Sequence, residues 1–152
     1  MQAHGIDFNE TFTPVAKLTS NCSILTLAAQ NDWEVHQVDV KNTYLNAELD
    51  EEIYMMQPPG FAALGNEDWV CLLKKALYGL KQAGRQWYTY LTDTFLKFGY
   101  MHCESEHCIF VRWSGSEFMA IVVAVDDLTI VATSVIMEDV RCELELVFKS
   151  PT

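Results

Sequence analysis

Apolar residues recur at helical spacing in three stretches of the chain. The clearest stretch is 83–98, and Gly99 follows it where a C-terminal helix stop is expected. Its apolar positions, spaced three or four residues apart, are Trp87, Leu91, Phe95 and Phe98. A second predicted helix, over 134–148, has an apolar face made of Met137, Val140, Leu144 and Val147. Proline directly after Thr13 resembles an N-cap with proline at the first helical position, which predicts a third helix over 14–30.

The remaining apolar runs are short, rich in β-branched residues and bounded by turn residues, as β-strands are. Strands are predicted over residues 34–40, 50–57, 69–74, 100–103, 108–112, 118–125 and 128–133. Helices and strands therefore follow one another in a mixed, largely non-alternating order. That order predicts an α+β fold, with an antiparallel sheet covered by helices on one side.

Length and composition exclude several classes of protein. A chain of 152 residues has the length of a single domain, and with 50% apolar and 20% charged residues it is expected to fold rather than to stay disordered. The longest uncharged apolar run, residues 118–125, is far shorter than the roughly 20 residues that a membrane-spanning helix needs. The N-terminal residues lack the basic start and the apolar stretch of a signal peptide. We therefore expect a soluble, intracellular protein without membrane contact.

The overall charge argues against a self-sufficient nucleic-acid-binding protein, but one stretch departs from it. The formal net charge is −11, whereas binding to phosphates requires basic residues. Residues 74–97, however, contain five bases against the single acid Asp93. The bases are Lys74, Lys75, Lys81, Arg85 and Lys97, and the aromatic residues among them are Tyr78, Trp87, Tyr88 and Tyr90. Such interleaving suits a polynucleotide, but an amphipathic helix with a solvated basic face has the same composition.

Five cysteines without a regular framework indicate reduced thiols. One cluster allows two interpretations, and its members are His102, Cys103, His107 and Cys108. Zinc could use such ligands, although the paired Cys-x-x-Cys spacing of zinc sites is missing. The other interpretation is a buried strand–turn–strand segment without a metal.

Two adjacent aspartates, Asp126 and Asp127, interrupt a long β-branched apolar run. The run predicts two buried strands, and the aspartates between them predict a two-residue tight turn. Asp is common in turns, but two adjacent carboxylates repel each other, and a divalent cation would relieve that repulsion. Asp39 lies near the end of the predicted strand 34–40, and a third carboxylate there would complete a cage for hard cations. The hairpin is therefore either an ordinary turn or part of a site for two Mg²⁺ ions about 4 Å apart, the usual clamp for in-line phosphoryl transfer.

Four blocks of sequence cover nearly the whole chain. They are GIDFNETFTPVAKLTS, HQVDVKNTYLNAELDEEIYMMQPPGF, VCLLKKALYGLKQAGRQWY and VAVDDLTIVATS. In order and spacing, these blocks resemble the reverse transcriptase of Ty1/copia retrotransposons. The resemblance implies the fingers and palm of a right-hand polymerase, without a thumb. It also implies RNA-directed DNA synthesis with two Mg²⁺ ions, in whose place Mn²⁺ can act.

The same resemblance implies roles for individual residues. Asp39, Asp126 and Asp127 would be the catalytic carboxylates that bind the metal ions. Tyr44 falls where the family places an aromatic residue that excludes ribonucleotides by clashing with the 2′-hydroxyl. The remaining implied residues are Val40, Gly79 and Lys81 for nucleotide binding, and Lys74, Lys75 and Arg85 for nucleic-acid binding.

The chain departs from the family's pattern at two places. Ala124 stands where many relatives have an aromatic residue that touches the primer end, and Ala83-Gly84 replaces a frequent Ser-Pro pair. Residues 1–152 are expected to form one partial reverse transcriptase domain. By comparison with the family, the basic fingers strands are missing upstream, and the rest of the palm, the thumb and the RNase H domain are missing downstream.

The implied partners are an RNA or DNA template-primer, deoxynucleoside triphosphates and the remaining segments of a longer polyprotein. The expected location is the cytoplasm, including virus-like particles, or the nucleus. The alternative is a catalytically inactive retroelement remnant that acts at most as a protein-interaction module. Intact Asp39, Asp126 and Asp127 favour the enzyme, because relaxed constraint would change these positions as readily as any others.

Overall fold

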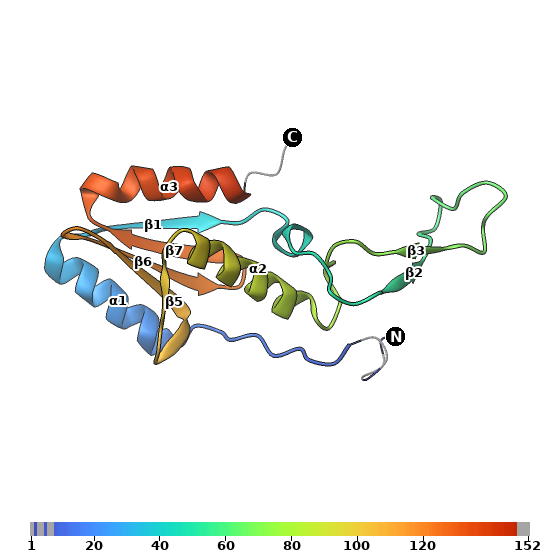
Figure 1. Cartoon of the computed structure of the whole chain (residues 1–152), viewed down its shortest axis with the longest axis horizontal. Helices are drawn as coiled ribbons and strands as arrows, with labels where there is room; N and C mark the ends of the chain where they lie inside the picture. The colour runs from blue at the N-terminus through green and yellow to red at the C-terminus, as the bar shows by residue number, and fades with distance from the viewer. Residues whose placement is uncertain (1, 3–4, 6–7, 149–152) are drawn as a thin grey trace.

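Five strands form one antiparallel sheet, to which three helices and a separate two-stranded arm are attached (Figure 1). The computed structural model describes residues 2, 5 and 8–148. Its elements are α1 (Leu18–Asn31), β1 (Glu34–Asp39), the 3-10 helix η1 (Thr43–Asn46), β2 (Tyr54–Met56), β3 (Val70–Leu72), α2 (Ala83–Lys97), β4 (Met101–Cys103), β5 (Glu106–Ser114), β6 (Glu117–Ala124), β7 (Asp127–Ala132) and α3 (Ser134–Phe148). Within these described ranges, no helix is both long and apolar enough to cross a membrane.

The strand order of the sheet is β1-β7-β6-β5-β4, and every neighbouring pair is antiparallel. Strands β4 to β7 follow one another along the chain as successive hairpins. Strand β1 instead comes from far upstream and pairs with β7 at the edge of the sheet. The predicted α+β fold with an antiparallel sheet is confirmed. The long-range pairing of β1 with β7 brings the ends of these two strands side by side.

Helices cover both faces of the sheet, so the predicted one-sided cover is wrong. Helices α2 and α3 pack over one face and enclose the larger core. Helix α1 packs on the opposite face, where its Ala28 contacts Phe118, Ala120 and Val131 (Figure 1). The cause lies in β6, because residues 118–123 are all buried and successive side chains point to opposite faces. A strand that is buried on both faces requires cover on both sides.

The helix boundaries were predicted well for α2 and α3 and poorly for α1. Helix α2 ends one residue before the predicted end, α3 has the predicted bounds, and Gly99 adopts the positive φ of 82° expected at a helix stop. Helix α1 begins at Leu18 rather than after Thr13, because residue 17 is still extended (φ −70°, ψ 139°). The preceding segment is tied to α2 by an ion pair between Glu10 and Arg85 with a 3.0 Å separation. Thr13 itself lies against Gly84 of α2, so this segment follows tertiary contacts rather than the local N-cap signal.

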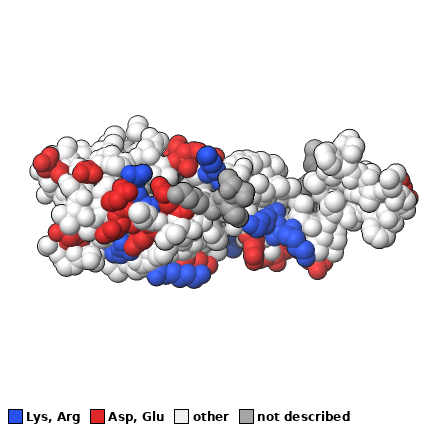
Figure 2. All heavy atoms as spheres, turned by 90° about the horizontal axis from the view of Figure 1, so that it is seen from above, with Lys and Arg blue, Asp and Glu red and all other residues white. Residues whose placement is uncertain are grey.

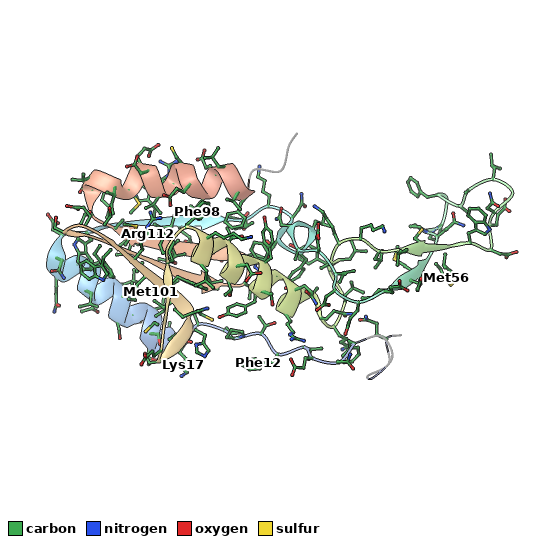
Figure 3. All side chains as sticks on the ribbon, viewed as in Figure 1. Phe12, Lys17, Met56, Phe98, Met101 and Arg112 are labelled. Carbon is green, nitrogen blue, oxygen red and sulfur yellow. The ribbon has the colours of Figure 1, made fainter. Side chains whose placement is uncertain are left out.

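The arm, residues 48–75, extends away from the sheet (Figure 1). Its two predicted strands, 50–57 and 69–74, shorten to three residues each. Beyond them, the two sides of the arm are joined by an isolated bridge between Glu48 and Lys75 and by separate backbone hydrogen bonds, such as the one from the Leu73 N–H to the Ile53 carbonyl (2.9 Å). A two-stranded ribbon without a second layer is marginally stable, which explains the short ladder. Exposed apolar side chains cover the arm, including Met56, which Figure 3 shows far from the sheet.

Candidate active site

Three aspartates, Asp39, Asp126 and Asp127, lie at one end of the sheet. Asp39, the last residue of β1, is the direct cross-strand partner of Asp127, the first residue of β7. Residues directly opposite each other place their side chains on the same face of a sheet. Asp126 stands next to them in the turn from β6. The expected turn Asp126-Asp127 is wrong by one residue: the turn consists of Val125 and Asp126, because Asp127 already pairs with Ala124 and Asp39.

The turn between β6 and β7 has an unusual backbone. Val125 has a φ of +58°, in the left-handed region that β-branched residues rarely adopt. Two hydrogen bonds act on the turn. Trp87 Nε1 donates to the carbonyl oxygen of Val125 (2.8 Å), and the backbone N–H of Val40 donates to the carbonyl oxygen of Asp126 (2.9 Å). The turn is thus fixed from α2 on one side and from the end of β1 on the other.

One carboxylate oxygen at the turn has no partner. Asp126 Oδ1 is buried and finds no hydrogen-bond partner in the described part of the chain. A buried carboxylate oxygen is unfavourable unless a donor or a cation compensates it. Among residues 2, 5 and 8–148, no group of three or more His, Cys, Asp or Glu side chains is arranged to hold a metal ion. The carboxylates of residues 39, 126 and 127 are therefore not arranged as a closed cage here, and Asp126 Oδ1 is the atom among them that is buried without a partner.

A pocket of about 340 Å³ lies beside the turn. Val125 lines it together with Tyr44, Gly79 and Lys81, three of the residues that the resemblance implies for nucleotide binding. Residues of the extended N-terminal segment, within 11–15, close another side. The pocket is therefore built where η1, the loop before α2, the N-terminal segment and the carboxylate turn meet.

Tyr44 connects the pocket with the carboxylates. Its ring packs against that of Tyr78, with ring centroids 4.6 Å apart. Burial raises the pKa of the Tyr44 phenol above its ordinary value, and the charge of Asp126 and the neighbouring Tyr78 raise it further. Tyr44 is thus a neutral phenol within electrostatic reach of the turn, and it presents an aromatic wall to the pocket.

Val40, the fourth residue implied for nucleotide binding, has its side chain in the core, where the residue is 3% exposed. Its backbone faces the site instead, through the hydrogen bond to the carbonyl of Asp126. A second backbone group is engaged locally, because the Val40 carbonyl accepts a 2.6 Å hydrogen bond from Thr43 Oγ1. The residue therefore acts on the turn through its main chain.

The basic stretch 74–97 does not gather into one patch. Lys74 and Lys75 are exposed at the base of the arm, whereas Arg85 lies on α2 in its ion pair with Glu10. Lys97 stands at the other end of α2, roughly 20 Å along the helix axis from its first residue. On the face shown in Figure 2, Lys and Arg side chains form separate groups with Asp and Glu beside them. This arrangement is that of a solvated surface with mixed charges.

The His/Cys cluster lies in the hairpin of β4 and β5, which confirms the predicted strand–turn–strand, but of its four members only Cys108 is buried. Tyr88 Oη donates a 2.9 Å hydrogen bond to the carbonyl of His107 and so ties this hairpin to α2. Burial raises the pKa of the Cys108 thiol to about 11. Because the thiolate is the form that binds metals, this thiol is poorly suited to a zinc site.

Sequence reasoning missed two contributors to the pocket. The segment 11–15 was expected to enter a helix, and Trp87 was expected to be a core residue or one of the aromatics among the bases. A buried indole N–H usually has a hydrogen-bond acceptor, so the sequence contained a hint that Trp87 has a polar partner. Nothing in the sequence identified Val125 as that partner.

Comparisons with known proteins agree on one family. The chain matches the family described as "Reverse transcriptase (RNA-dependent DNA polymerase)" over residues 1–151. It is 50% identical over 132 residues to the retrovirus-related Pol polyprotein from transposon TNT 1-94 of Nicotiana tabacum, covering 86% of this chain and 10% of that relative. It is 40% identical over 136 residues to the corresponding polyprotein from transposon RE2 of Arabidopsis thaliana, covering 90% and 9%. A putative Ty5-1 transposon protein of Saccharomyces cerevisiae is 40% identical over 97 residues, covering 64% and 32%.

The match to these relatives is a match to one part of them. The chain spans about a tenth of the length of the two plant polyproteins. No solved structure matches the chain.

Proposed function

Because the chain belongs to the reverse transcriptase family, in its Ty1/copia retrotransposon branch, we propose that it forms the polymerase site of an RNA-directed DNA polymerase. The reaction would join a deoxynucleoside triphosphate to the 3′-hydroxyl of a primer. One observation carries the proposal: Asp39 and Asp127 pair in register beside Asp126, next to a pocket of suitable size. A polymerase requires this combination of clustered carboxylates and an adjoining nucleotide pocket.

We assign metal binding to Asp39, Asp126 and Asp127. Carboxylate oxygens are the ligands that Mg²⁺ and Mn²⁺ prefer, and the unpaired, buried Asp126 Oδ1 supports a cation at this end of the sheet. When bound, two such ions would activate the primer hydroxyl and neutralise the charge of the leaving pyrophosphate.

The other residues of the site bind and orient the nucleotide. Lys81 is exposed at the pocket, where its ammonium group would attract the triphosphate. Gly79 has a φ of +96°, which favours glycine, and the absence of a Cβ leaves its backbone open to a sugar or phosphate. Tyr44 would clash with a 2′-hydroxyl and so select deoxyribonucleotides. Val40 would support this set through its backbone bond to the turn.

The proposal includes the place of the chain in a larger machine. The sheet with α2 and α3 would belong to the palm, and the arm to the fingers, of one partial domain that spans residues 1–152. The plant relatives are Pol polyproteins, so we propose that the remaining fingers, the thumb and RNase H belong to a longer polyprotein. The template-primer would then be gripped mainly by those parts, with Lys74, Lys75 and Arg85 adding local phosphate contacts.

A graft tests the proposal, because 50% identity permits exchange of the matching segment. Residues of this chain replace the corresponding part of the tobacco TNT 1-94 polyprotein, and extension of a primed RNA template is measured. We expect DNA synthesis by the graft and a loss of at least about 100-fold in its Asp126→Asn variant. The Tyr44→Ala variant should incorporate ribonucleotides more often, whereas Asp68→Asn on the arm serves as the charge-matched control without effect.

The contrary outcome has a clear form. If the tobacco polyprotein extends the primer while a soluble, folded graft does not, this segment is an inactive remnant. Equal activity of the graft and its Asp126→Asn variant would also contradict the proposal, because the carboxylate turn would then have no part in the reaction.

A further inference from the structure

We propose that Trp87 is a positioning residue for the carboxylate turn: its indole N–H holds the Val125–Asp126 peptide in the orientation that presents Asp126 and Asp127 to a cation. This inference rests on the proposed function of the site, and it concerns the helix that supports the site rather than the carboxylates themselves. The geometry that leads to it is the 2.8 Å hydrogen bond from Trp87 Nε1 to the carbonyl oxygen of Val125.

Trp87 is held rigidly by its surroundings. It lies on α2 and is only 2% exposed. Its ring stacks on that of Tyr90, with ring centroids 5.9 Å apart. It also makes an edge-to-face contact with the ring of Phe148 in α3, with centroids 5.7 Å apart. Because two aromatic neighbours fix the ring, the indole N–H has a fixed direction. It therefore can impose a position on the turn instead of following it.

The turn needs such a restraint because its backbone is unfavourable by itself. Val125 has a φ of +58°, and a branched Cβ disfavours this region. If the carbonyl of Val125 were released, Val125 could relax by rotation of its backbone toward negative φ. That rotation would move Asp126 away from the paired strand ends. The N–H of Val40 donates to the following carbonyl, that of Asp126, and restrains the turn from the β1 side. Trp87 supplies the second restraint, from α2.

A packing role alone does not account for this hydrogen bond. A phenyl ring would fill most of the same apolar space between α2 and the sheet. Val125 is 43% exposed, so the hydrogen bond joins a buried indole to a residue at the surface of the turn. The specific effect of the bond is therefore on the conformation of the turn. We expect its loss to weaken cation binding more than it weakens the fold.

The test replaces the N–H donor and measures cation affinity on the full chain. Trp87→Phe removes the donor, and 3-benzothienylalanine incorporated at position 87 keeps the shape of the indole but has sulfur in place of N–H. Trp33→Phe is the matched control, because Trp33 stacks on Phe118 at the opposite face of the sheet. Mn²⁺ affinity is measured by electron paramagnetic resonance of the free ion, alongside a thermal melt of each protein.

Both replacements at position 87 should weaken Mn²⁺ binding about tenfold. Trp33→Phe should leave the Mn²⁺ affinity unchanged within twofold, although it should lower the melting temperature about as much as Trp87→Phe does. In the parent chain, the Trp87 indole N–H resonance should broaden at substoichiometric Mn²⁺, and the Trp33 resonance should not. Should Trp87→Phe fail to fold, the benzothienylalanine protein alone gives the decision.

The outcomes separate the inference from the proposed function. If the parent binds Mn²⁺ through the carboxylates, as shown by loss of binding in Asp126→Asn, and both Trp87 replacements bind equally well, the inference is wrong while the proposed function stands. If the parent and Asp126→Asn both fail to bind Mn²⁺, the metal site of the proposed function is refuted, and the positioning role with it.

Discussion

The register pair of Asp39 and Asp127 predicts a measurable electrostatic penalty in the absence of divalent cations. Cross-strand partners have Cβ atoms about 4.5–5.5 Å apart, so the two carboxylates face each other on one side of the sheet. Like charges that are directly opposite in this way are destabilising. Replacing either aspartate by asparagine removes the repulsion with little change in side-chain volume. We therefore expect Asp39→Asn and Asp127→Asn each to stabilise the chain in EDTA.

The size of the effect follows from Coulomb's law. At a separation of about 6 Å, two unit charges repel by about 0.7 kcal/mol in bulk water and by about 2.8 kcal/mol at an effective dielectric constant of 20. Both side chains are exposed, so screening by water keeps the value near the lower limit, at about 1 kcal/mol. For a chain of this size, that corresponds to a rise in melting temperature of about 2–4 °C.

A double-mutant cycle distinguishes this pair from two unrelated surface charges. The repulsion disappears with the first substitution, so the double variant should gain no more than either single variant, giving a coupling of about 1 kcal/mol. The measurement is a set of thermal melts at low ionic strength in EDTA, with Asp68→Asn on the arm as the control, expected within about 0.5 kcal/mol of the parent. In 1 M salt the gain should shrink, because exposed charges are screened over about 3 Å.

Two results would refute this reasoning. Additive gains from Asp39→Asn and Asp127→Asn would mean that the carboxylates do not interact with each other. No gain from either, at low salt and without divalent cations, would mean that the strand ends do not hold the two charges close together.

Two further predictions concern residues around the site. At Gly84, an added Cβ would lie 2.9 Å from Thr13 Oγ1. Gly84→Ala should therefore fail to add the roughly 1 kcal/mol of stability expected from helix propensity in the parent chain, but it should approach that gain in a Thr13→Ala background. Equal gains in the two backgrounds, measured by urea denaturation, would contradict the contact. Burial raises the pKa of Cys108 to about 11, above the ordinary value of 9.0. The neutral thiol therefore contributes stability that is fully present below pH 9 and is lost as the pH rises through 11. The free energy of unfolding should fall by roughly 2 kcal/mol over this range. Urea denaturation at pH 8 to 11 should therefore show a shallower loss in Cys108→Ala than in the parent, whereas Cys22→Ala, at an exposed thiol, should follow the parent; identical slopes for all three would refute the assignment.

Much of the fold could be predicted from the sequence because its local and tertiary preferences agree. The 83–98 stretch has one apolar face and a glycine stop, and the structure uses both. The β-branched run around Asp126 forms two neighbouring strands, as its composition requires. The prediction failed where tertiary contacts overrule a local signal. Thr13 and the proline after it form a good N-cap sequence, yet they lie in an extended segment packed on α2.

The candidate site was only partly predictable for a different reason. The pattern of the sequence finds each aspartate at the end of a strand, but it does not say that β1 pairs with β7, since that pairing is a property of the whole sheet. The resemblance to a known family supplied the missing link between Asp39 and the pair at 126 and 127. It gave no information on Trp87, whose hydrogen bond depends on the exact rotation of α2 over the sheet.

Three departures from ordinary protein chemistry coincide at this one sheet end. A branched residue adopts positive φ at Val125, a carboxylate oxygen of Asp126 is buried without a partner in the described chain, and Asp39 faces Asp127 across two strands. A turn that served only to connect β6 and β7 would be more stable with glycine or asparagine at position 125 and with one carboxylate fewer. Each departure lowers stability by an amount on the order of 1 kcal/mol, and none compensates another. Under the proposed function, cations bound at this end of the sheet would offset the repulsion between Asp39 and Asp127 and pair with the buried Asp126 oxygen, and the strained turn would support them.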